Sequence, residues 1–267
     1  MAKETLCLSL ACANPRLGDV AANVATVAKA VQDAKADLVA FPEMFLSGYG
    51  IGDDASRLAL TLDDERLEPI RQAARKAKAH VVVGGPRKAR PGVTHNAAFC
   101  IAPDGTTTAY DKRALATFTT FQEGLFFRPG RTDPVWETDL GTVGLSICYD
   151  LFFPEFQRRQ ALAGADLLLN ISASPSTSQR FFEAILPARA IENASFMAYT
   201  NCVGPQDAVV FWGGAQAWGP RGTLLGRIEP LKPGRLDVTL DRADLVPARE
   251  FRPTLRDAAT EDLADLA

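Results

Sequence analysis

The sequence has little of what several common classes of protein require. Its 267 residues include only two histidines, His80 and His95, which stand apart from any pair of cysteines, so a zinc site has little to build on. The formal net charge of -3 gives no basic patch of the kind that nucleic acid or an anionic membrane requires. No apolar run approaches the roughly 20 residues of a membrane-spanning helix. We therefore expect no metal, no nucleic acid and no membrane among its partners.

The cysteines and the N-terminus give no sign of export. The five cysteines are odd in number, widely scattered and set in apolar segments, which is unlike a disulfide framework. Residues 1–10 carry a single lysine and alternate like a strand, without the charged-then-apolar plan of a signal peptide. We therefore expect reduced thiols and a cytoplasmic location.

Strand-like and helix-like segments alternate along the chain. With 47% hydrophobic and 23% charged residues, the composition is that of an ordinary soluble globular protein and shows no break that favours two domains. The first elements expected are strands at 5–13, 37–41 and 80–83 and helices at 20–34 and 65–79. Gly84, Gly85 and Pro86 are expected to stop the third strand.

Tight turns join many of the later strands. Hairpins are expected at 95–112, 134–150 and 209–229, helices from Pro154 and at 179–193, and strands at 165–172, 196–204 and 236–240. Helices interleaved with hairpins predict a mixed sheet, or two sheets, with the helices on the outer faces.

Cys148 lies in the segment SICYDLFFPE, between a buried-strand pattern and a helix that starts near Pro154. This position is the carboxyl end of a strand, where open α/β sheets place their ligand sites. A helix N-terminus nearby is expected to lower the pKa of the thiol. On these residues alone, Cys148 is either a nucleophile or a buried structural cysteine, because free cysteine is among the most buried residue types.

A nucleophilic cysteine needs a base, and the histidines are poor candidates. His80 and His95 each begin a strand, so both read as structural. Glu43, in LVAFPEMFLSGYG, is either a solvated loop residue or a base whose pKa is raised by burial. Lys112, at the end of TTTAYDK, is either a surface charge or an ammonium that stabilises an oxyanion. Glu123 follows in a loop and is suited to hold Lys112 or to orient a substrate amide.

Three motifs, in this order, resemble those of the carbon-nitrogen hydrolase family, the nitrilase superfamily. They are FPEMFLSGY with Glu43, YDKRAL with Lys112 and CYDLFFPE with Cys148. Each motif alone is weak evidence for the family. Three motifs together, each at a strand end and at separations ordinary for the family, are specific evidence. The resemblance extends over residues 5–246 and includes PARAIENASFMAYTN and FWGGAQAWGPRG.

The resemblance implies a four-layer α-β-β-α sandwich of mixed sheets and a Glu-Lys-Cys triad that uses no metal or organic cofactor. Glu43 is then the general base for Cys148. Lys112 and the main-chain N–H of Tyr149 stabilise the tetrahedral intermediate, and Glu123 matches a second glutamate that positions the substrate and the lysine. Loss of ammonia or an amine leaves a thioester on Cys148, which water activated by Glu43 converts to a carboxylic acid.

The resemblance also bears on assembly and on the end of the chain. Members of the family pair across the helices that correspond to 154–164 and 179–193, so a homodimer or a larger even homo-oligomer is implied. We expect one hydrolase domain over 1–246. Residues 247–267 are then either a loosely attached tail or an arm that packs on a partner subunit.

The residues after the cysteine indicate the reaction. Tyr149 and Asp150 resemble the Tyr-Asp pair frequent in amidases and carbamoylases, whereas nitrilases usually have Trp-Glu. The expected substrate is a small primary amide with an uncharged aliphatic or aromatic side chain. Similar motifs occur in the glutaminase domains of glutamine-dependent NAD synthetases, but this chain ends where a synthetase domain would begin. The residues expected to contact the substrate are Tyr49, Phe118, Tyr149, Ser172, Ala173 and Ser174.

Two other functions remain open at this point. An N-carbamoyl amide hydrolase uses the same triad with an added clamp for a carboxylate, and Arg180 and Arg189 are either that clamp or helix-surface and intersubunit residues. Nitrilase and glutaminase-type activities are less favoured. A catalytically silent scaffold is disfavoured because Glu43, Lys112 and Cys148 are all intact.

Overall fold

Two mixed β-sheets face each other in the computed structural model, which describes residues 3–132 and 134–258. The first sheet has the order β14 (Gly234–Asp241), β1 (Thr5–Cys12), β2 (Leu38–Ala40), β3 (His80–Arg90), β4 (Val93–Ile101) and β5 (Thr107–Asp111). The second has the order β13 (Leu224–Arg227), β12 (Gln216–Trp218), β9 (Phe196–Asn201), β8 (Leu167–Ser172), β7 (Gly141–Ile147) and β6 (Val135–Thr138). In each sheet, three neighbouring strands are parallel (β1–β3 and β7–β9), and the flanking strands run antiparallel to their neighbours.

Successive side chains of the strands divide between two cores. In β1, Leu8 and Leu10 point into the core between the two sheets. In β3, Val82 points into the same core, whereas Val81 and Val83 point the other way, toward the helices. Strands buried on both faces read as continuous apolar runs, which is why these segments lack the polar alternation of a half-exposed strand.

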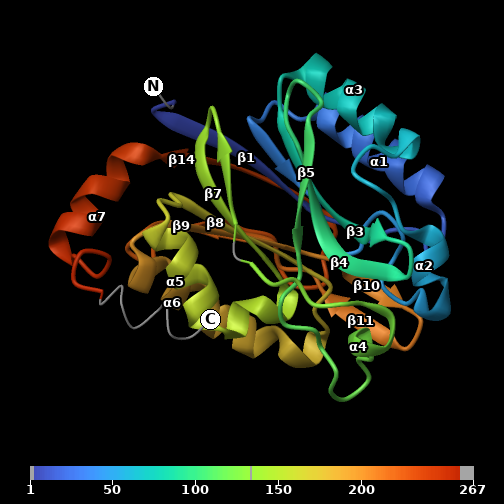
Figure 1. Cartoon of the computed structure of the whole chain (residues 1–267). Helices are drawn as coiled ribbons and strands as arrows, with labels where there is room; N and C mark the ends of the chain where they lie inside the picture. The colour runs from blue at the N-terminus through green and yellow to red at the C-terminus, as the bar shows by residue number, and fades with distance from the viewer. Residues whose placement is uncertain (1–2, 133, 259–267) are drawn as a thin grey trace.

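The helices form the two outer layers (Figure 1). On the first sheet lie α1 (Val20–Asp33) and α3 (Glu68–Ala77), and on the second lie α5 (Pro154–Leu162) and α6 (Gln179–Asn193). Single turns form α2 (Ala55–Leu58) and α4 (Glu123–Phe126), and β10 (Val203–Gln206) pairs with β11 (Val209–Trp212) in a small separate sheet. The sequence-based expectation of a four-layer sandwich with mixed sheets is therefore confirmed.

Two expectations about strand ends were wrong. The strand that begins at His80 continues through Gly84 and Pro86 to Arg90, because these residues pair with β4 along its length. The segment FMAYTNCVG divides into β9 and β10, and β11 pairs with β10 instead of joining the hairpin of β12 and β13. Gly213 and Gly214, both with φ of 70°, form the bend that separates β11 from β12.

The described end of the chain packs on its own protein. After β14 the chain forms α7 (Leu245–Phe251), and the guanidinium groups of Arg242 and Arg249 lie 2.8 and 2.9 Å from the carboxylate oxygens of Asp166. The remainder of the predicted tail, 259–267, lies outside the described residues. Within the part of the chain that the structure describes, no helix has both the length and the apolar character needed to cross a bilayer.

Candidate active site

The candidate site lies at one edge of both sheets, where strands that run in the same direction end. Glu43 comes three residues after β2, and Lys112 directly follows β5, in the first sheet. Cys148 directly follows β7, and Ala173 directly follows β8, in the second. Because carboxyl ends of parallel strands meet at one edge, the fold brings together residues that are far apart in the sequence.

A glycine lets the Glu43 segment approach the first sheet closely. The main-chain N–H of Gly84 donates to the Pro42 carbonyl at 3.1 Å. A Cβ atom at Gly84 would lie 2.4 Å from the main-chain nitrogen of Met44 and 2.5 Å from Cα of Glu43. Gly84 therefore serves close packing behind Glu43 and does not end a strand.

Lys112 is buried between two carboxylates. Its Nζ lies 2.7 Å from Oε1 of Glu43 and 2.7 Å from Oε1 of Glu123. Lys112 and Glu43 have no exposed surface, and Glu123 is 3% exposed. The other Glu123 oxygen accepts a 2.8 Å hydrogen bond from the main-chain N–H of Ala116. This arrangement excludes the surface-charge reading of Lys112 and the solvated-loop reading of Glu43.

Asn96 also belongs to the cluster, and the sequence analysis missed it. Its Nδ2 donates to Oε1 of Glu43 at 2.7 Å and to Oε1 of Glu123 at 3.4 Å. The hydroxyl of Tyr49 also donates to Oε1 of Glu123, at 2.7 Å. The signal for Asn96 was available in HNAAFC, where a single amide stands at the start of a run of six buried residues in β4.

Burial determines the electrostatics of the cluster. Burial raises the pKa of Glu43, partly offset by the charge of Lys112. Burial lowers the pKa of Lys112, but the charges of Glu123 and Glu43 outweigh it and hold that pKa well above its ordinary value. The lysine is therefore a permanent cation, while Glu43 is a carboxylate with an increased affinity for a proton.

The pKa of the Cys148 thiol differs from the sequence-based expectation. Cys148 has φ of 47°, an uncommon value for a non-glycine residue, at the start of a 3₁₀ turn over Cys148–Phe152. Burial and the neighbouring Glu43 carboxylate raise the pKa of the thiol well above its ordinary value. The predicted lowering by a helix N-terminus is therefore wrong, because desolvation exceeds that effect. A protonated thiol makes a neighbouring base necessary.

A cavity of about 250 Å³ opens onto Cys148. Its described lining is mostly aromatic and carries no charged side chain: Tyr49, Ala116, Phe118, Phe121, Cys148, Tyr149, Phe152, Ser174, Pro175, Ser178, Phe181 and Phe182. Four of the six predicted substrate contacts, Tyr49, Phe118, Tyr149 and Ser174, belong to this lining.

The other two predicted contacts lie behind the wall of this cavity. The hydroxyl of Ser172 donates to Oδ1 of Asn170 at 2.8 Å, within the core. Ala173 is fully buried, and its main-chain N–H donates to Oε2 of Glu43 at 2.7 Å. Ala173, the residue directly after β8, thus orients the carboxylate of Glu43 instead of lining the cavity.

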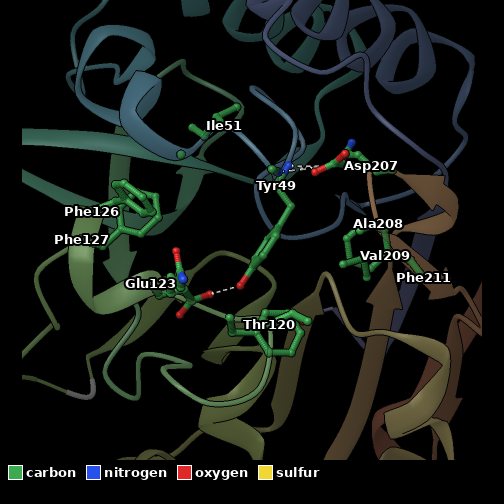
Figure 2. A pocket seen from close by; sticks show the side chains of 15 residues that line it. Tyr49, Ile51, Thr120, Glu123, Phe126, Phe127, Asp207, Ala208, Val209 and Phe211 are labelled. Atoms are coloured by element: carbon green, nitrogen blue, oxygen red, sulfur yellow. Dashed lines mark hydrogen bonds between the residues drawn. The ribbon is translucent and has the colours of Figure 1, made fainter.

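A second cavity, of about 260 Å³, lies on the other side of Tyr49. Figure 2 shows the phenol of Tyr49 crossing this cavity toward Glu123, with Ile51 and Phe126 on one side and Val209 on the other. Tyr49 and Phe121 line both cavities, and their rings meet edge to face with centroids 5.8 Å apart. These two rings are the partition between the cavities.

The histidines and the two candidate arginines lie outside the cluster. His80 is buried with Nε2 3.2 Å from Oδ1 of Asp139, and the Nδ1 of His95 lies 2.7 Å from the Arg128 carbonyl. The Nε of Arg189 donates to the Leu151 carbonyl at 3.0 Å, which is a structural role. Arg180 is exposed, and its guanidinium lies 4.6 Å from the ring centroid of Phe181, at the cavity wall.

Comparison with protein families agrees with this site. The model of the carbon-nitrogen hydrolase family matches residues 7–250, so the chain belongs to that family, the nitrilase superfamily. It is accordingly a hydrolase that acts on C–N bonds.

Individual relatives include amidases. The chain is 32% identical to "Hydrolase in pqqF 5'region" of Pseudomonas protegens, over 99% of this chain and 93% of that protein. It is 32% identical to an (R)-stereoselective amidase of a Pseudomonas species, over 91% of this chain and 87% of that protein. It is 34% identical to a glutamine-dependent NAD(+) synthetase of Aquifex aeolicus, but spans only 42% of that protein's length.

Solved structures of similar proteins share the fold. An amidase of Nesterenkonia from the nitrilase superfamily has a TM-score of 0.85 at 27% identity, over 99% of this chain and 98% of that one. In a variant of that amidase, the active-site cysteine carries the acetamide moiety of fluoroacetamide. A CN-hydrolase superfamily protein of Xanthomonas campestris has a TM-score of 0.88 at 26% identity, over 97% of this chain and 98% of that one.

Proposed function

We propose that the protein hydrolyses small primary amides to a carboxylic acid and ammonia through a thioester on Cys148. The observation that carries the proposal is the convergence of Glu43, Lys112 and Cys148 beside a cavity of about 250 Å³. The thiol has a raised pKa and therefore needs a base, and the adjacent Glu43 has a raised proton affinity. The amidases among the relatives support the same reaction.

Acylation follows from these positions. Glu43 takes the thiol proton while the sulfur attacks the carbonyl carbon, so a C–S bond forms and the carbonyl oxygen becomes an oxyanion. Lys112, a fully buried and permanently charged cation, stabilises that oxyanion together with the main-chain N–H of Tyr149. When the intermediate collapses, the C–N bond breaks and Glu43 returns the proton to the leaving ammonia.

Deacylation uses the same groups in the same order. Glu43 takes a proton from a water molecule that attacks the thioester carbonyl, and when the C–S bond breaks Glu43 returns the proton to the sulfur, which gives the carboxylic acid and the thiol. Glu123 keeps Lys112 in place through the 2.7 Å contact and is itself held by Tyr49 and Ala116. Its role is to position the lysine.

The cavity lining favours an uncharged acyl group. Of the described residues that line it, none is ionised, and the rings of Phe118, Phe152 and Phe182 supply apolar surface. An aliphatic or aromatic side chain would bury its surface there, whereas a carboxylate would be desolvated without a partner in the lining.

Arg180 supports a second candidate, hydrolysis of N-carbamoyl or other carboxylate-bearing amides. Its guanidinium stacks on Phe181, whose ring lines the cavity, so a substrate carboxylate that reached the rim would find a cation. In this reading the triad is unchanged and only the far end of the substrate differs.

Ammonia release across matched compounds separates the two candidates. We expect butyramide and benzamide to be hydrolysed faster than glutamine, N-carbamoyl amino acids and the matching nitriles. Arg180→Ala should leave the rates on uncharged amides within about twofold, because the residue lies outside the reacting groups. Faster hydrolysis of an N-carbamoyl amino acid, lost in Arg180→Ala, would establish the second candidate instead.

We also propose that two chains associate across α5 and α6. Exposed apolar side chains on α6 support this, since Phe181 is 44% and Ile191 is 41% exposed. Sedimentation equilibrium should give twice the chain mass of 28.7 kDa. A mass of one chain at all micromolar concentrations would contradict the dimer.

A further inference from the structure

The groups of the site come from two different sheets. Glu43 and Lys112 follow strands of the first sheet, whereas Cys148 follows a strand of the second. The distance from lysine to sulfur therefore depends on how one sheet lies on the other. The core between the sheets is apolar, and apolar packing is not directional. A fixed distance between Lys112 and the sulfur of Cys148 therefore requires a directional contact, such as a hydrogen bond, that joins the two sheets close to the site.

Asp150 makes such a contact with the segment after Lys112. Its carboxylate is fully buried. Oδ1 accepts hydrogen bonds from the main-chain N–H groups of Ala114, at 2.7 Å, and Arg113, at 3.2 Å. These are the two residues that follow Lys112, so the first sheet's loop is held by a side chain of the second.

The other oxygen of Asp150 holds the nucleophile's own turn. Oδ2 accepts from the main-chain N–H of Ile147 at 2.9 Å, one residue before Cys148. It also accepts from the hydroxyl of Tyr110, on β5, at 2.9 Å. The positive φ of Cys148 is an uncommon conformation that persists only where surrounding contacts determine it, and the bond from Ile147 is one of these contacts.

The chemistry of this position suits a carboxylate specifically. Four donors meet two oxygens, which matches the roughly four lone-pair sites of an ionised carboxylate. An asparagine side chain has the same shape, but its NH₂ group would replace one of the two oxygens. The two donors that bond to that oxygen would then face another donor and lose their acceptor. Burial raises the pKa of Asp150 to about 6, partly offset by the N–H of Ala114 and the charge of Lys112, so the group is mostly ionised at pH 7.

We propose that Asp150 is a positioning residue that sets the distance between Lys112 and Cys148 by joining the two sheets. It is not among the residues that line the cavity, and its carboxylate bonds to none of the reacting atoms, so it acts through the segments that carry them. Misplacement of a catalytic group by about 1 Å costs on the order of 10²-fold in rate. The proposal relies on the proposed amide hydrolysis for one of its readouts.

The test compares Asp150→Asn with Asp166→Asn. Asp166 also joins distant segments through Arg242 and Arg249, but away from the site, so its variant is the control for lost stability. We expect Asp150→Asn to lower kcat on an amide by about 10²-fold with KM within about twofold, and Asp166→Asn to leave kcat unchanged. Equal effects of the two variants on kcat would overturn the proposal. Absence of ammonia release by the unmodified protein would instead reject the proposed function.

Alkylation of Cys148 by chloroacetamide supplies a readout that is independent of the substrate. Alkylation needs the thiol and its base but forms no oxyanion, and Glu43 keeps its own bond to the second sheet through Ala173. In Asp150→Asn the alkylation rate should therefore fall by less than about fivefold, far less than kcat. A fall as large as that in kcat would mean that Asp150 acts on the thiol alone and would overturn the proposal.

A second variant, Tyr110→Phe, decides the question if Asp150→Asn does not fold, because it removes only one of the four bonds to Asp150. A threefold to tenfold lower kcat at unchanged KM supports the proposal, and an unchanged kcat overturns it.

Discussion

The main-chain N–H of Ala173 donates a 2.7 Å hydrogen bond to Oε2 of Glu43. Ala173 follows β8 of the second sheet and Glu43 follows β2 of the first, so this bond joins the sheets at the site. The other oxygen, Oε1, accepts from Lys112 and Asn96. With both oxygens engaged, the carboxylate has a fixed orientation, and its complete burial raises its pKa although the bonds from Lys112 and Asn96 act in the opposite direction.

Replacing Glu43 with glutamine should abolish most of the activity. Glu43→Gln keeps the shape but removes the proton acceptor, so kcat should fall by about 10²–10⁴-fold while KM changes little. Steady-state kinetics on a primary amide measures both. Glu65→Gln, at an exposed glutamate in the turn before α3, is the matched control and should retain normal rates. A Glu43→Gln variant with more than a tenth of the normal kcat would contradict the assignment.

The pH dependence of kcat/KM should reflect two buried carboxylates, the base Glu43 and the positioning residue Asp150, whose pKa is raised to about 6. Because burial raises the pKa of Glu43 above the ordinary 4.5, activity should decline on acidification at a pH above that value. The thiol itself should set no acid limb, since its pKa is raised well above its ordinary value and it is protonated throughout this range. A profile that stays flat down to pH 4.5 would show that Glu43 is not the base.

Lys112 should contribute to stability as well as to catalysis. Lys112→Met leaves Glu43 and Glu123 buried without their cation, and an uncompensated buried charge costs about 3–5 kcal/mol. Adding Glu123→Gln removes one of these charges, so the double variant should be more stable than the sum of the two single losses predicts. Urea denaturation of the four proteins gives the coupling. Strictly additive losses would mean that Lys112 and Glu123 do not interact.

Asp150 should make the protein less stable as the pH rises. Its pKa is raised in the folded state, from 3.8 to about 6, so the stabilisation is fully present below pH 3.8 and is lost as the pH rises through 6. The shift corresponds to about 3 kcal/mol at about 1.4 kcal/mol per pKa unit. The free energy of unfolding should therefore fall between pH 4 and pH 7 by more in the unmodified protein than in Asp150→Asn. Equal changes in both proteins would contradict the raised pKa.

Most of the fold and the three central residues were predictable from local patterns. The helix at 179–193 and the hairpins of β4 with β5 and of β6 with β7 follow from short-range periodicity and turn residues. Glu43, Lys112 and Cys148 each occur in a recognisable motif at a strand end. Ser172 and Ala173 were expected to contact the substrate, but Ser172 bonds to Asn170 in the core and Ala173 bonds to Glu43 of the other sheet. The Ala173–Glu43 bond spans 130 positions, and no local pattern encodes such a contact.

Other features required the three-dimensional arrangement. Gly84 reads as a strand breaker in the sequence, and only the approach of the Glu43 segment explains why it lies inside a strand. The pKa of Cys148 depends on how deeply the fold buries the thiol, and local sequence predicted the opposite direction. Asn96 could have been suspected as an amide within an apolar strand, but its partners were not deducible.

The covalent intermediate provides the most direct test of the proposed reaction. The purified protein is mixed with a primary amide that it hydrolyses and is quenched in acid within the first turnovers. It is then digested, and the masses of the peptides are measured by mass spectrometry. The account predicts the mass of the acyl group on the peptide that contains Cys148, no such mass in Cys148→Ala, and no ammonia release by that variant. Ammonia release that persists in Cys148→Ala, or an acyl group on a different residue, would contradict it.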